Sequence, residues 1–74
     1  MIVPLHWLKP GQSARVVELC AADPARLERL SAFGLVPGSR VRIEQLHPAL
    51  IFCLDSIEIS IDEEVAREII VQTE

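Results

Sequence analysis

Hydrophobic and polar residues alternate along several short segments of the chain, and such segments are predicted to be β-strands. In residues 57–61 every second residue is isoleucine, and all three isoleucines are expected to point inward. Val17 and Leu19 would likewise share the inward face of a strand. Residues 49–54 are apolar throughout, so both faces of this strand are expected to be covered, one of them by a partner. The five predicted strands are residues 14–20, 39–47, 49–54, 57–61 and 68–72.

A short helix is predicted between the first two strands. Asp23 is a good N-cap because its carboxylate can accept the free amide hydrogens of the first turn. Pro24 is tolerated at the first helical position because the N–H that it lacks would have no partner there. Leu27, Leu30 and Phe33 follow at intervals of three residues, which indicates a single apolar stripe on the helix.

Two neighbouring glycines mark the end of this helix and the start of the next strand. Gly34 follows the last apolar residue of the helix, where a left-handed backbone often ends a helix and costs glycine little. Pro37 and Gly38 suit the central positions of a type II turn, because proline fixes the first φ and glycine supplies the positive second one. We therefore interpret Gly34, Pro37 and Gly38 as structural turn residues.

Five strands with hairpin-length connections and one inserted helix predict a mainly β domain. Because the strands are short and adjacent in sequence, we expect a small, highly curved antiparallel barrel, since closure removes sheet edges. The chain of 74 residues has the length of one domain, so residues 1–74 are expected to form a single unit.

The hydrophobic content of the chain is high for its length, at 50%. A domain of this size buries only about 60% of its unfolded surface, so we expect apolar contact with a partner or, weakly, with a second copy. No apolar run approaches the roughly 20 residues of a membrane span, and the N-terminus has no signal-peptide pattern. With Cys20 and Cys53 interpreted as free thiols, the expected protein is cytoplasmic and does not insert into membranes.

The net charge of −4 is divided unevenly along the chain. Residues 1–54 carry six basic and four acidic side chains, for a net charge of +2, whereas residues 55–74 carry one arginine and seven acids, for a net charge of −6. Affinity for nucleic acid comes from many phosphate contacts, which so weakly basic a segment cannot supply. We therefore expect no nucleic-acid partner and interpret the acidic segment as a solvated face.

No pattern in the chain predicts a catalytic or metal centre. His6, His47, Cys20 and Cys53 are candidate metal ligands, but no two of them have the spacing of a metal motif. His47 and Cys53 could approach across a hairpin; the alternative, which we prefer, is a turn histidine and a buried thiol. The carboxylates of residues 62–64 lack a partner charge, and no nucleophile or phosphate-binding motif is present. We expect no enzyme, no metal site and no cofactor.

Four apolar residues are the candidates for a partner-binding surface. Leu35 and Val36 lie in the loop between two glycines, where burial is difficult, and Leu50 and Phe52 share one face of the apolar strand. The alternative is that all four belong to the core. The exposure of these side chains in the folded protein distinguishes the two interpretations.

The order of these motifs resembles that of a known family. The chain has Leu-Lys-Pro-Gly at residues 8–11, RLxxLxxFGLxPGS at residues 26–39, three alternating isoleucines before an acidic stretch, and Val-Ala-x-x-Ile-x-Val at residues 65–71. This pattern is similar to the FeoA family of bacterial ferrous iron transport accessory proteins. The same domain recurs at the C-terminus of iron- and manganese-dependent repressors of the DtxR type.

The resemblance implies an SH3-like barrel with an inserted helix and a role beside FeoB, the membrane ferrous iron transporter with a G-protein domain. Two functions follow from it. The protein would be an adaptor that docks on the cytoplasmic part of FeoB through an apolar patch, or a metal- or ligand-sensing module that acts on a metal-dependent transcriptional regulator. The chain has no helix-turn-helix, which favours the adaptor.

Overall fold

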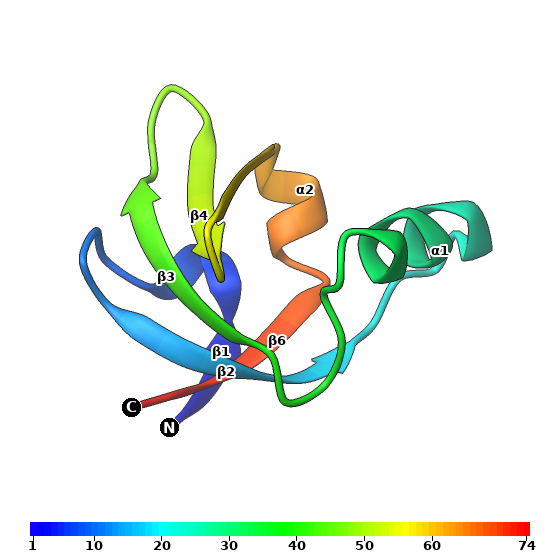
Figure 1. The fold of residues 1–74 in the computed structure, drawn as a ribbon, viewed down its shortest axis with the longest axis horizontal. Coiled ribbons are helices and arrows are strands. Elements are labelled where there is room, and N and C mark those ends of the chain that lie inside the picture. Colours follow the sequence, from blue (N-terminus) through cyan, green and yellow to red (C-terminus); the bar gives the residue numbers. More distant parts are fainter.

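The protein folds as a strongly curved antiparallel sheet with a helix beside it, as the computed structural model of residues 1–74 shows (Figure 1). The elements are β1 (Ile2–Pro4), the 3-10 helix η1 (Leu5–Trp7), β2 (Ser13–Leu19), α1 (Pro24–Ala32), β3 (Arg40–Gln45), β4 (Leu50–Leu54), β5 (Ile57–Ile61), α2 (Glu63–Ala66) and β6 (Ile69–Thr73). The spatial order is β1-β6-β2-β3-β4-β5, so β1 and β5 are the edges. The mainly β, SH3-like class and the inserted helix are confirmed, with six strands in place of five. Neither α-helix is long and apolar enough to cross a membrane.

The additional strand, β1, has only three residues, and alternation cannot reveal so short an element. It pairs with β6, and Val3 lies opposite Val71 with both side chains buried. Pro4 ends the strand, which is tolerated because an edge strand leaves some N–H groups unused. The chain then turns through η1, which places Leu5 and Leu8 in the core.

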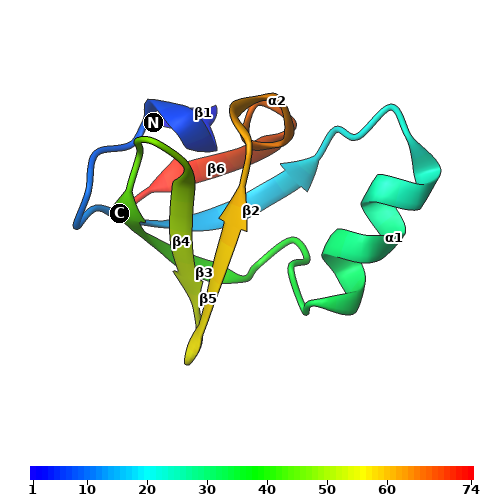
Figure 2. The ribbon, with the colours of Figure 1, turned by 90° about the horizontal axis from the view of Figure 1, so that it is seen from above.

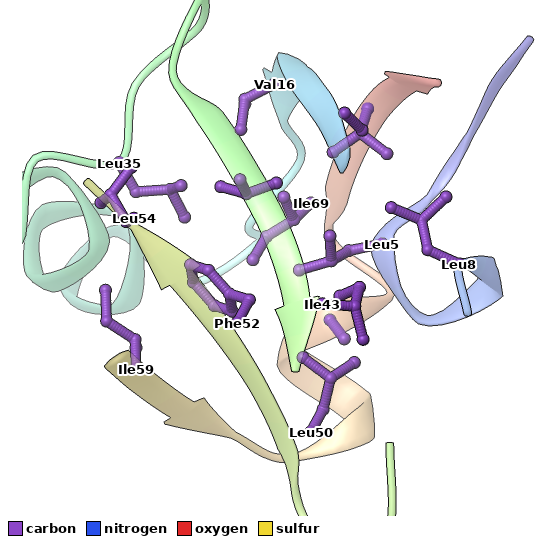
Figure 3. Packing of buried hydrophobic residues seen from close by; sticks show 14 of the residues in the cluster. Leu5, Leu8, Val16, Leu35, Ile43, Leu50, Phe52, Leu54, Ile59 and Ile69 are labelled. Carbon is purple, nitrogen blue, oxygen red and sulfur yellow. The ribbon is translucent and has the colours of Figure 1, made fainter. Parts of the chain in front are cut away.

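Sixteen buried residues form one core inside the curved sheet, and all of them are apolar (Figure 3). Phe52 is fully buried, and its ring points into the middle of the cluster. Leu50 and Leu54 flank it on the inner face of β4, while Ile51 and Cys53 on the outer face are half-buried. The folded chain therefore already covers part of the outer face that we expected a partner to cover.

Two predicted strand faces are wrong. In β2, Val16 is buried and Val17 is exposed, because the register with β6 shifts between Val16 and Glu18 and the alternation changes phase there. In β5, Ile59 is buried, but Ile57 is exposed although its partner Leu54 is buried, because Ile57 begins an edge strand that has no further strand beside it (Figure 2). Alternation therefore identified these strands but not every inward-facing residue.

Only one of the three regularly spaced apolar residues of α1 faces the core. Leu30 is buried, whereas Leu27 and Phe33 are exposed. On a helix of 3.6 residues per turn, positions three apart differ in direction by about 60°, so Leu27 and Phe33 diverge to opposite sides of Leu30. The prediction of a single apolar stripe is therefore corrected. Of these three side chains one is buried in the core and two are exposed to solvent.

The two ends of α1 form as predicted. At the start, the Asp23 carboxylate accepts the backbone N–H of Ala25 at 3.0 Å. At the end, Gly34 has a φ of +94°, and the N–H of Leu35 donates to the carbonyl of Leu30 at 3.1 Å. This is the hydrogen-bond pattern of a Schellman motif, in which the residue after the glycine packs back on the helix. It brings Leu35 to the buried Leu30 and so anchors the end of α1 to the core.

The turn that leads from α1 into β3 is also confirmed. The N–H of Ser39 donates to the carbonyl of Val36 at 2.9 Å, and Gly38 has a φ of +95°. Proline first and a positive φ second define a type II turn. The Gly38 N–H also donates to the carbonyl of Val16 at 2.7 Å, which fastens the turn to β2.

Candidate functional site

The structure separates the four apolar residues that were candidates for partner binding. Leu35 and Phe52 are 0% exposed and Leu50 is 4% exposed, so these three belong to the core and cannot contact a partner. Burial of Leu35 follows from the helix-ending motif, which turns its side chain back toward Leu30. Val36 is 44% exposed and is the only one of the four that a partner could reach.

A groove of about 410 Å³ separates α1 from β5 and α2. In Figure 2, β4 lies on one side of β5 and α1 stands on the other. Phe33, which is 56% exposed, is the largest apolar side chain on the helix side of the groove. The lining residues are Arg26, Arg29, Leu30 and Phe33 from α1, Ser60 and Ile61 from β5, and Asp62 and Val65 around α2.

The first turns of α1 are fixed by a carboxylate just before β6. The Glu68 Oε1 atom lies 2.7 Å from Nη1 of Arg26, and its Oε2 atom accepts the backbone N–H of Ala22 at 3.4 Å. The hydrogen bond to Glu68 raises the pKa of Arg26 above its usual value. Together with the buried Leu30, this contact holds α1 at a set position opposite β5.

The groove contains one cation without a partner. Arg26 is neutralised by Glu68, but Arg29 forms no ion pair. The carboxylate of Asp62 accepts the backbone N–H of Val65 at 3.0 Å and so caps α2. An acidic group entering the groove would therefore find Arg29 available.

The groove was not predicted from the sequence because its walls come from segments that are distant along the chain. Phe33 was assigned to a buried stripe, and Arg29 had no distinguishing pattern. The usable signal is the spacing of three residues in α1, which spreads Leu27, Leu30 and Phe33 over about 120° of the helix surface.

Both histidines line a second hollow, of about 550 Å³, beside the β3–β4 connection. His6, His47, Asp62 and Glu63 are among its lining residues, and the Nδ1 atom of His6 is buried without a hydrogen-bond partner. No three histidine, cysteine, aspartate or glutamate side chains of the protein lie close enough together to hold a metal ion.

The cysteines lie apart from these histidines. His47 precedes β4, whereas Cys53 is near the end of that strand and donates its S–H to the carbonyl of Asp55 at 3.1 Å. Cys20 is exposed after β2, and desolvation followed by the charge of Glu18 raises the pKa of its thiol. A raised pKa keeps the thiol protonated near neutral pH, and a protonated thiol is a poor nucleophile and metal ligand.

We expect the protein to fold without metal. EDTA should leave the thermal unfolding curve unchanged, because metal stabilises a fold only through a ligand set that folding completes. The measurement is a circular dichroism melt with and without chelator, on the parent and on Cys53→Ser. A drop in melting temperature on chelation that Cys53→Ser abolishes would contradict the prediction.

Solved structures with the same fold cover nearly all of this chain. The crystal structure of an iron uptake regulatory protein, FeoA, has a TM-score of 0.89 at 23% identity and covers 100% of this chain and 99% of its own. FeoA from Chlorobium tepidum has a TM-score of 0.89 at 26% identity, and the match covers 96% of this chain and 70% of that protein. IdeR from T. acidophilum has a TM-score of 0.90 at 26% identity, and the match covers 99% of this chain but only 34% of IdeR.

A family model gives the same assignment at the level of sequence. The model described as the FeoA domain matches residues 3–73, which is nearly the whole chain. Among curated proteins, none matches. The fold, the extent of this match and the structural likeness to FeoA proteins and to a repressor domain agree, and the chain belongs to the FeoA family.

Proposed function

We propose that the protein is a cytoplasmic, non-catalytic accessory protein of bacterial ferrous iron uptake that docks on the cytoplasmic part of a FeoB-type transporter. The observation that carries this proposal is the FeoA domain match over residues 3–73. Relatives described as an iron uptake regulatory protein and as iron(II) transport protein A from Clostridium thermocellum support it. The latter is 27% identical, and the match covers 96% of this chain.

The surface that suits such docking is α1 with the loop that follows it. Leu27, Phe33 and Val36 are all exposed there. Burial of apolar surface contributes roughly 25 cal/mol per Å² removed from water, but lost translational and side-chain freedom offsets much of this gain. We therefore expect weak to moderate binding with little salt dependence, and the acidic C-terminal segment would affect association rates more than strength.

Binding should depend on Phe33 and Val36. In a titration against the soluble cytoplasmic domain of a FeoB-type transporter, Phe33→Ser and Val36→Ser are expected to weaken affinity by roughly tenfold each, because truncating an apolar anchor typically costs more than 1 kcal/mol. Val17→Ser is the matched control, because Val17 is similarly exposed, at 40%, but lies on β2. Equal affinity of all three variants and the parent would move the docking site away from α1.

The second candidate function is a sensing module that acts on a metal-dependent regulator. It is favoured by the match to IdeR, a protein of which this chain spans only about a third. Gene neighbourhood distinguishes the two candidates, because an adaptor would be encoded beside a transporter with a GTPase domain and a sensing module beside a repressor.

A further inference from the structure

β5 has backbone hydrogen-bonding groups that no part of the protein uses. It is the last strand of the sheet and pairs only with β4, through a two-residue turn that sets Leu54 opposite Ile57. The two residues that flank such a turn form backbone hydrogen bonds with each other. The backbone N–H and C=O groups of the next residue in the strand, and of every second residue after it, therefore point away from the hairpin. The N–H and C=O groups of Glu58 and Ser60 therefore face outward, and neither residue takes part in any loop or side-chain hydrogen bond.

The Ser60 end of this free edge lines the groove beside α1. Ser60 and Ile61 of β5 line the groove together with Phe33 and Arg29 from the α1 side. Figure 2 shows α1 standing beside β5. An extended segment in the groove would therefore meet three kinds of contact at once. These are the outward-facing backbone groups of Ser60, the apolar side chains of the groove, and the guanidinium of Arg29, which has no ion-pair partner.

We propose that the groove binds a short extended segment of a partner protein, which adds to the sheet as a strand next to β5. Strand addition of this kind takes affinity from main-chain hydrogen bonds and specificity from alternate side chains. The chemistry of the walls selects apolar residues at every second position and an acidic residue beside Arg29. The proposal rests on the proposed function only in assigning the segment to the transporter's cytoplasmic part.

A second copy of this chain is a poorer occupant than a single segment. The edge of β5 is not open to a whole sheet, because α1 stands beside it across the groove (Figure 2). Two copies that paired through β5 would each bring an α1 helix into the space that the other needs.

The test removes one outward-facing N–H without touching the β4–β5 ladder. Ser60→Pro lacks the N–H at an edge position where proline is tolerated, whereas the control Ser60→Ala keeps it. In titrations against the transporter's soluble cytoplasmic domain, Ser60→Pro is expected to bind roughly tenfold more weakly or worse, and Ser60→Ala like the parent. A folded Ser60→Pro variant, verified by its amide NMR spectrum, that binds like the parent would overturn the proposal.

A peptide probe separates this proposal from the proposed function. The probe is a capped pentapeptide in which valine alternates with aspartate, added to the ¹⁵N-labelled protein. We expect the amide NMR signals of Glu58 and Ser60 to shift on binding, and to shift less in the Arg29→Glu variant. Two further peptides carry N-methyl groups on alternate backbone nitrogens, one on the odd and one on the even residues. Only the peptide whose methyl groups replace the N–H groups that face β5 should lose binding. If the peptide gives these results while the transporter domain fails to bind, strand addition at the groove is supported and the assigned partner is wrong. Shifts confined to amides of other strands, or equal binding by the two methylated peptides, would overturn the proposal that a strand adds at the groove.

Discussion

Phe52→Ala is expected to lower the free energy of unfolding by about 3–5 kcal/mol, because it removes an aromatic ring from a close-packed core and leaves a cavity. Phe52 is 0% exposed, and its neighbours come from strands on several sides of the cluster (Figure 3). A small domain has a total stability of only about 5–15 kcal/mol. The variant should therefore unfold at a much lower urea concentration than the parent, as followed by circular dichroism.

Ile57→Ala is the matched control for this change. Ile57 lies on the neighbouring strand β5 but is 54% exposed, and surface substitutions usually change stability by no more than about 0.5 kcal/mol. If Phe52→Ala unfolded at the same urea concentration as Ile57→Ala, the core would not be centred on Phe52. For the same reason, substitutions of the buried Leu35 and Phe52 cannot test docking, because a loss of binding would then reflect a loss of the fold.

The parts of the fold that were predicted correctly depend on local rules. Asp23 caps α1, Gly34 ends it, and Gly38 completes the turn into β3, because each requirement is met within five residues of sequence. The inserted helix and most strand segments follow from periodicity in the same way. Failures occurred where a distant contact decides the outcome, as with the register shift against β6 that reverses the faces of Val16 and Val17.

The candidate site was largely beyond prediction for a related reason. Leu35 is the exception, because the helix-ending motif that folds it onto Leu30 is local, and the expected exposure of this loop residue was wrong although the motif itself was predicted. The groove requires α1 and β5 to face each other, and nothing in either segment encodes that adjacency. That Arg29 has no ion-pair partner likewise becomes known only when the structure gives the positions of all the acidic side chains.

Gly34→Val is expected to lower the free energy of unfolding by about 1–3 kcal/mol, and Gly38→Val by a similar amount. Both glycines have φ near +95°, a region that β-branched residues rarely adopt. A Cβ atom at either position would meet no atom within 4 Å, so backbone strain rather than a clash sets the cost. Gly34→Asn is the control, because asparagine tolerates the left-handed region and should cost less than valine. Thermal melts of the three variants test this order. Valine variants that melt like the parent would show that neither the helix end nor the turn requires glycine.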